Sequence, residues 1–111
     1  MRVLPDKTIT DVPGILASGV AAGIKKDGTK DICVIFSKYK ASAAAVFTTN
    51  RVKGAPVLIS AENIRNENTR AIVVNSGNAN SCTGEEGISN ARKMLEASAQ
   101  CLELTPREVL I

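Results

Sequence analysis

Small and amide side chains gather in one segment of the chain, which follows a short β-branched run and precedes an amphipathic stretch. Glycines in such a segment permit unusual backbone angles, and amide and hydroxyl groups are short hydrogen-bond donors and acceptors. Loops after strand ends often bind ligands in α/β layers. The segment could therefore bind a polar ligand, or its asparagines could satisfy their own backbone in a turn. The candidate residues are Asn75, Ser76, Gly77, Asn78, Asn80, Thr83 and Gly84.

Nucleophilic catalysis has few candidate groups here. The chain has no histidine, which excludes a Ser-His-Asp or Cys-His arrangement within it. Cys82 lies near a predicted helix start that could favour its thiolate, but Glu85 and Glu86 oppose a negative charge there. We therefore interpret Cys82 as a small buried side chain. The same carboxylates, and glycine spacing unlike that of known phosphate loops, argue against a phosphate site.

Two further clusters have both a functional and a structural interpretation. Thr48, Thr49 and Asn50 precede Arg51 and could project into a cleft, although we favour their capping a turn before a helix. Five lysines near the predicted hairpin could bind a polyanion, but solvated turns and protected sheet edges explain them better. These lysines are Lys25, Lys26, Lys30, Lys38 and Lys40.

Composition limits the class of protein. A chain of 111 residues suits one domain, residues 1–111, and only 3% of its residues are aromatic, which disfavours binding of nucleic acid by base stacking. Its three cysteines are widely spaced and lack C-x-x-C pairs, so we expect reduced thiols and no metal site. No apolar stretch reaches the ~20 residues of a membrane span. We expect a soluble, cytoplasmic protein with no membrane contact.

The first half of the chain predicts strands. Small and β-branched residues at 17–25, 32–36 and 42–49 predict an antiparallel meander. The Asp27-Gly28 pair predicts the hairpin turn between the first two strands. We expect Cys33 to be a core residue of the second strand.

The second half alternates helices and strands. Pro56 and the apolar spacing that follows predict a helix over 55–65, and the continuous run at 70–75 predicts a buried strand. A second helix should begin after Thr83 as N-cap, with an apolar stripe and a buried Cys101. A Thr105-to-Glu108 capping box predicts one helical turn before a strand at 109–111. The overall prediction is an α+β fold.

Three ordered motifs resemble a known family. The segments ASGVAAGIK, AAVFTTNRVKGAPV and AIVVNSGNANSCTGEEG are similar, in order and spacing, to the N-terminal part of the ornithine acetyltransferases of arginine biosynthesis. Ser81 stands where members often carry alanine. The resemblance implies one sheet-and-helix layer of an α/β/β/α sandwich, part of a self-processing fold like that of the N-terminal nucleophile enzymes.

The resemblance also implies a reaction and its partners. The family moves an acetyl group from N-acetylornithine to a threonine freed by self-cleavage, and then to glutamate; some members also accept acetyl-CoA. The family's Thr-Gly oxyanion pair follows the position of Ile111, and the nucleophilic threonine lies further on. We therefore assign no catalytic residue and no bound cofactor to this chain, and we expect it to be inactive alone. Its expected partner is the rest of its precursor or a companion chain, in a homo- or hetero-oligomer.

Two other functions remain open from sequence. The chain could be a noncatalytic binding or assembly domain whose asparagine-rich loop holds the ligand. It could also belong to a related self-processing aminopeptidase, which would share the fold and hydrolyse an amide.

Overall fold

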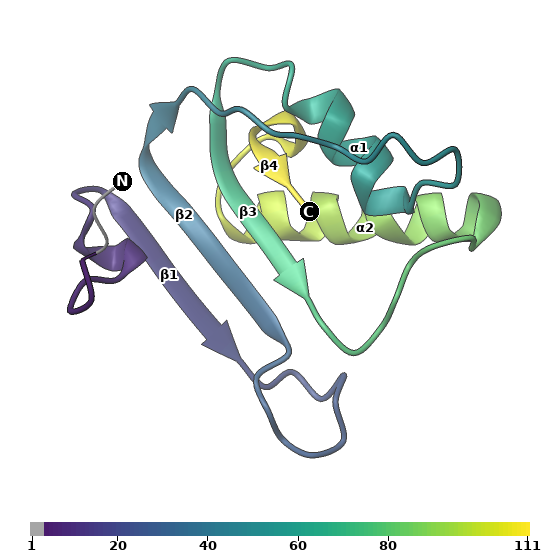
Figure 1. Cartoon of the computed structure of the whole chain (residues 1–111), viewed down its shortest axis with the longest axis horizontal. Helices are drawn as coiled ribbons and strands as arrows, with labels where there is room; N and C mark the ends of the chain where they lie inside the picture. Colours follow the sequence, from purple (N-terminus) through teal and green to yellow (C-terminus); the bar gives the residue numbers. More distant parts are fainter. Residues whose placement is uncertain (1–3) are drawn as a thin grey trace.

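One four-stranded sheet carries two helices on a single face in the computed structural model, which describes residues 4–111 (Figure 1). This arrangement confirms the predicted α+β fold. The elements, in chain order, are η1 (Ile9–Asp11), β1 (Ile15–Val20), β2 (Ile32–Ala41), α1 (Ala55–Asn63), β3 (Thr69–Asn75), α2 (Gly84–Cys101), η2 (Pro106–Glu108) and β4 (Val109–Leu110).

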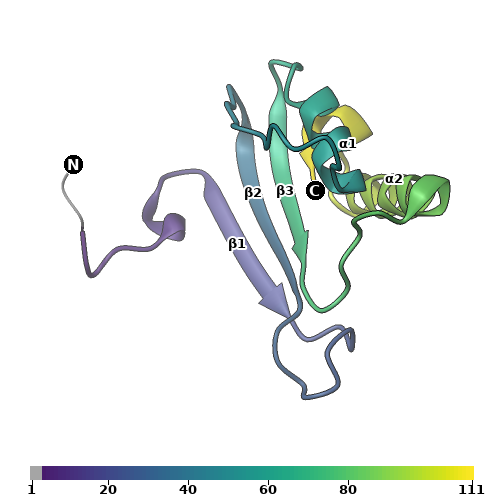
Figure 2. The same ribbon diagram turned by 45° about the vertical axis from the view of Figure 1, so that its right-hand side comes forward.

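The strands lie in chain order across the sheet. The pairs β1–β2 and β2–β3 are antiparallel, whereas β3 and β4 are parallel, with Ala71 opposite Val109. A parallel pair needs a long crossover, which α2 and η2 provide. Both helices lie over β3 and β4, while β1 extends away from them (Figure 2).

The core lies between the sheet and the two helices. Ile59 of α1, Leu95 and Ala99 of α2, and Val73 and Val109 of the sheet form its centre. The predicted stripe on α2 is confirmed, because Ala91 and Leu95 are buried and Ile88, Ser98 and Leu102 are half-buried. Alternate residues of β3 therefore face the helices, as the two-residue period of a strand requires.

The strand predicted at 42–49 is wrong. Residues 42–50 have no regular secondary structure, and Val46 is 99% exposed. Strand β2 continues to Ala41 and has β1 on one side and β3 on the other, so neither edge is free for another neighbour. The third strand of the antiparallel part is therefore β3.

The β1–β2 connection is longer than the predicted hairpin turn. Strand β1 ends at Val20 rather than near Lys25, and residues 21–31 form the connection. Asp27 does form a tight local turn, because its Oδ1 accepts hydrogen bonds from Thr29 N and Oγ1 at 3.0 and 2.7 Å.

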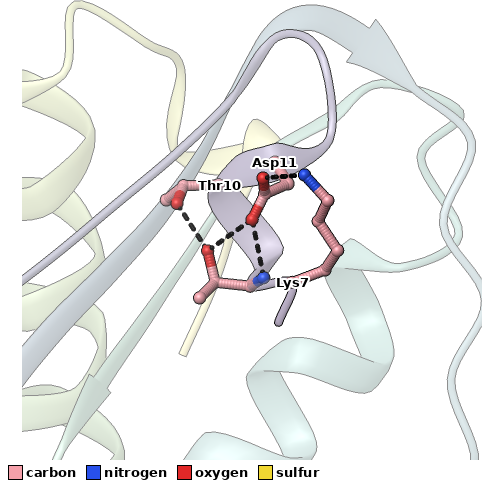
Figure 3. A network of polar contacts seen from close by, with 4 residues as sticks. Lys7, Thr10 and Asp11 are labelled. Atoms are coloured by element: carbon pink, nitrogen blue, oxygen red, sulfur yellow. Dashed lines mark hydrogen bonds and ion pairs between the residues drawn. The ribbon is translucent and has the colours of Figure 1, made fainter. Parts of the chain in front are cut away.

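A short 3-10 turn, η1, leads into β1. The carboxylate of Asp11 accepts hydrogen bonds from Lys7 Nζ at 2.9 Å and from the backbone N–H of Thr8 at 2.7 Å (Figure 3). The Thr8 N–H bond, followed by the Lys7 bond, lowers the pKa of Asp11 below its ordinary value. Local polar contacts thus define this turn, which buries none of its residues.

The second helix begins at the predicted residue, although the Thr83 side chain makes no capping hydrogen bond, and the end of the chain folds as its capping signal predicted. Helix α2 begins after Thr83, and Glu108 Oε2 accepts from both N and Oγ1 of Thr105 at 2.9 Å. Those bonds hold the pKa of Glu108 below its ordinary value. The capping box and the strand that follows it are confirmed.

Helix α1 supplies polar side chains to the edge of β4. Asn63 Nδ2 donates to the carbonyls of Pro106 and Val109, both at 2.8 Å. Ser60 Oγ donates to Ile111 O at 2.7 Å and accepts from Ile111 N at 3.1 Å. These bonds fix the helix to backbone groups of β4 and Ile111 that no further strand of the described residues pairs.

The cysteines are less buried than predicted. Cys33 is half-buried in β2, but Cys82 and Cys101 are exposed, so the predictions of buried Cys82 and Cys101 are wrong. Cys101 occupies the last position of α2, and Cys82 lies on the loop before that helix. None of the helices within residues 4–111 is long and apolar enough to cross a membrane.

Candidate functional site

The loop from Asn75 to Gly84 joins β3 to α2 and is held by the backbone of two other segments. Ser76 N donates to Asp31 O at 2.8 Å, beside the start of β2. Further along, Asn80 O accepts from Ala55 N at 3.2 Å, at the start of α1. The loop therefore has fixed positions relative to the sheet and to both helices.

Two of its asparagine side chains bond within the loop and α2. Asn75 Nδ2 donates to Asn78 O at 3.3 Å, and Asn80 Nδ2 donates to Gly87 O at 2.8 Å. Thr83 Oγ1 donates to Asn80 Oδ1. Asn75 and Asn80 therefore follow the structural interpretation, in which the asparagine side chains bond to nearby backbone groups. A Cβ at Gly87 would overlap the Thr83 hydroxyl, so the bonded arrangement requires glycine there.

The seven predicted residues lie on one loop but face different surroundings. Asn75, Asn78 and Asn80 line a groove of about 520 Å³ between the sheet and α2, whose walls include Val34, Val73 and Met94. Thr83 and Gly84 line a separate hollow of about 330 Å³, together with Cys82 and Lys53. Ser76 and Gly77 line neither of these two spaces.

The groove combines mainly apolar walls with several asparagine amides, the usual composition of a small-molecule site. Ile24, from the β1–β2 connection, and Ile111 also line it. The structure thus brings three chain segments, distant in sequence, to the carboxyl end of β3. The described residues bring together no three His, Cys, Asp or Glu side chains that could hold a metal ion.

Asp31 is a buried acid beside the loop that sequence reasoning missed. Its side chain is 3% exposed, and its oxygens accept from the backbone N–H groups of Ala22, Ile24 and Lys25 at 2.6, 2.7 and 3.0 Å. These bonds, that of Ala22 foremost, lower the pKa of Asp31 below its ordinary value of 3.8. The available signal was an acid directly before a β-branched run.

The Thr48-to-Arg51 corner lies on the connection between β2 and α1. Asn50 N donates to Thr48 Oγ1 at 3.1 Å, and Val52 N donates to Asn50 Oδ1 at 2.9 Å. These are local turn bonds between exposed residues, which agree with the interpretation we favoured.

Sequence comparisons identify relatives along the whole chain. The model of the ArgJ family matches residues 16–111. The arginine biosynthesis bifunctional protein ArgJ 1 of Clostridium acetobutylicum is 51% identical over 111 residues, which is 100% of this chain and 27% of that protein. The ArgJ protein of Caldanaerobacter subterraneus is 50% identical over 88% of this chain and 24% of its own length. The chain spans about a quarter of the curated relatives it matches.

Solved structures agree with these relatives. The ArgJ protein of Bacillus halodurans superposes with a TM-score of 0.89 at 34% identity, over 94% of this chain and 55% of that one. The ornithine acetyltransferase of Mycobacterium tuberculosis, solved with ornithine, gives a TM-score of 0.89 at 39% identity, over 98% of this chain and 60% of that one. Because the family model matches most of the chain and the same family supplies its structural neighbours, the chain belongs to the ArgJ family.

Proposed function

We propose that this chain is the N-terminal layer of an ornithine acetyltransferase, inactive alone, in an enzyme that transfers the acetyl group of N-acetylornithine to glutamate through an acyl-threonine. Membership of the ArgJ family carries the proposal. The Mycobacterium tuberculosis relative is named an ornithine acetyltransferase and was solved with ornithine.

The register of β3 and β4 supports a position of the asparagine loop close to the reacting groups. The two strands are parallel, with Ile72 opposite Leu110, so residues that follow β4 advance toward Asn75. Ile111 already lines the same groove as the loop amides. In the family the Thr-Gly oxyanion pair comes directly after this position. Ligands commonly bind outside the carboxyl ends of such strands.

The uncovered face of the sheet supports a partner for this chain. Ile35, Ile72 and Val74 lie on the face opposite the helices, where Ile72 and Val74 are exposed. A strand with apolar residues on both faces is typical of a sheet buried on both sides. We propose that the rest of the precursor, or a companion chain, packs a second sheet there, as in an α/β/β/α sandwich.

An acetyl-transfer assay tests the reaction and the inactivity separately. The purified 111-residue chain and the complete enzyme that contains it receive N-acetylornithine and glutamate, and formation of N-acetylglutamate is measured. Transfer by the complete enzyme, with none by the 111-residue chain, supports the proposal. Transfer by the chain alone would overturn its inactivity, and a complete enzyme that transfers nothing would overturn the reaction. Hydrolysis of peptide amides instead would favour the related aminopeptidase.

A pair of asparagine variants tests the loop. Asn78→Ala removes an amide that lines the groove, whereas Asn68→Ala removes one before the opposite end of β3. We expect Asn78→Ala to raise the KM for N-acetylornithine roughly 10-fold in the complete enzyme, and Asn68→Ala to leave it within about twofold. Equal effects would place the substrate elsewhere.

Two finer points belong to the same proposal. Acetyl-CoA is a second donor to test in the same assay, with no cofactor held by this chain. The cytoplasm is the proposed compartment, because free thiols at Cys33, Cys82 and Cys101 suit a reducing environment.

A further inference from the structure

The β1–β2 connection is organised by one carboxylate. Asp31 is buried immediately before β2, and its side chain receives three backbone N–H groups from residues 22–25. Such charge-assisted bonds are stronger than bonds between neutral groups, and a buried carboxylate needs them to remain ionised. The segment 22–25, which has no helix or strand of its own, therefore takes its shape from Asp31.

The backbone of Asp31 reaches the asparagine loop directly. Its N–H donates to Val20 O at 2.9 Å, which closes the end of β1, and its carbonyl accepts from Ser76 N at 2.8 Å. One residue thus joins the end of β1, the segment 22–25 and the first residue after β3. A change in its position moves all three together.

The segment 22–25 then packs against the middle of the same loop. Gly77 has a φ of +96°, and a Cβ at that position would lie 2.9 Å from Lys25 Cγ and 3.2 Å from Ile24 Cγ2. The loop backbone at Gly77 therefore lies against the side chains of Ile24 and Lys25. The backbone N–H groups of these same two residues donate to the Asp31 carboxylate. Ile24 also lines the groove that contains the loop amides.

We infer that Asp31 is a positioning residue for acetyl transfer, acting through Ser76 on one side and through Ile24 and Lys25 on the other to fix the asparagine loop. This inference rests on the proposed function. Asp31 itself touches no reacting atom; its contribution is the placement of amides that line the groove. Loss of about 1 Å of placement can reduce a reaction rate by roughly 100-fold.

A charge-matched pair of variants in the complete enzyme tests this role. Asp31→Asn replaces one acceptor oxygen by an amide that faces backbone N–H groups. Asp27→Asn removes the same charge from the same connection, where, within the part of the chain that the structure describes, its carboxylate bonds only Thr29. We expect Asp31→Asn to lower kcat/KM for N-acetylornithine about 10-fold or more and to speed amide exchange at residues 76–80. Asp27→Asn should change neither by more than about twofold.

Two glycine variants repeat the test without touching the carboxylate. Gly77→Ala pushes on Lys25 and Ile24, whereas Gly28→Ala introduces an equally left-handed alanine, at a φ of +74°, with no atom within 4 Å of the added Cβ. We expect Gly77→Ala alone to lower kcat/KM in the same direction as Asp31→Asn. This pair keeps the inference testable if Asp31→Asn fails to fold.

The outcomes separate the two proposals. Faster exchange at residues 76–80 with unchanged kinetics would overturn the positioning role, as would unchanged exchange in Asp31→Asn. Equal kinetic losses in Asp31→Asn and Asp27→Asn would also overturn it. A wild-type enzyme without acetyl transfer would refute the proposed function instead, while the exchange measurement would still report whether Asp31 holds the loop.

Discussion

The two faces of the sheet have similar sequences and very different surroundings. Val73 and Val74 are neighbours on β3, yet Val73 is 4% exposed beneath the helices and Val74 is 47% exposed on the opposite face. The residues paired with them on β2 are Val34 and Cys33, so both faces continue as apolar surface. Hydropathy alone therefore does not distinguish the covered face from the open one.

The difference shows where the stability of this chain arises. On the helix side, buried aliphatic groups from α1, α2 and the sheet exclude water together. On the open side, Ile72 and Val74 remain in contact with solvent. Matched substitutions on the two sides should consequently have unequal effects, and the size of that inequality can be measured.

The largest expected effect is at the centre of the helix side. Ile59→Ala removes a side chain of α1 that is 2% exposed and should lower the free energy of unfolding by about 3 kcal/mol. Its neighbour Leu58 is 46% exposed, and Leu58→Ala should cost less than about 1 kcal/mol. Urea denaturation of the 111-residue chain provides the measurement, and similar losses for both variants would contradict the buried core described for α1.

A polar contact on the helix side should come next. Asn63→Ala leaves the carbonyls of Pro106 and Val109 without their shared donor and should cost about 2 kcal/mol. Asn66 is the matched control, because its Nδ2 lies 3.5 Å from Arg107 O at an exposed position. Asn66→Ala should cost less than about 0.5 kcal/mol by the same denaturation experiment. Equal costs would mean that Asn63 does not hold β4.

The adjacent valines compare the two faces directly. In the 111-residue chain, Val73→Ala should destabilise by about 1.5 kcal/mol and Val74→Ala by less than about 0.5 kcal/mol. In the complete enzyme the two losses should become similar, because the proposed second sheet buries Val74. A persistent difference there would show that the open face stays in solvent.

The smallest effect concerns acid sensitivity at the end of the sheet, away from both faces. The folded pKa of Asp31 lies below its ordinary value of 3.8, so its contribution to stability is present above that value. The contribution is lost as the pH falls below 3.8 through the folded pKa. Carbon-13 NMR titration of the carboxyl group should give a midpoint below 3.8, with amide protection of residues 22–25 lost in parallel. A midpoint at or above 3.8 would contradict the three N–H bonds.

The sequence predicted those elements whose signals are local. The stripe that contains Ala91 and Leu95, the capping box from Thr105 to Glu108, and the helix start after Thr83 depend on neighbours a few residues away. The resemblance was confirmed by the family match, and the α+β class by the fold. That the asparagine loop binds the substrate stays a prediction, although the structure places three of the loop's amides at the wall of the groove.

The failures came from long-range pairing. Residues 42–49 have β-branched and aromatic side chains, but they can pair with β2 only if one of its edges is free. Both edges of β2 are already paired, one with β1 and the other with β3. The role of Asp31 likewise depends on Ser76, which is distant along the chain. Cys101 occupies the end of a helix whose buried stripe passes through Ala99 instead. None of these facts is encoded in a short window.

The polar side chains that α1 presents to β4 have a consequence for association between copies. Asn63 and Ser60 occupy the outer carbonyl and amide groups of Val109 and Ile111, which would otherwise recruit another strand. At the opposite margin of the sheet, β1 has a strand neighbour only in β2 among residues 4–111. Growth of this sheet into an aggregate is thus directed to one margin, the outer side of Ile15–Val20.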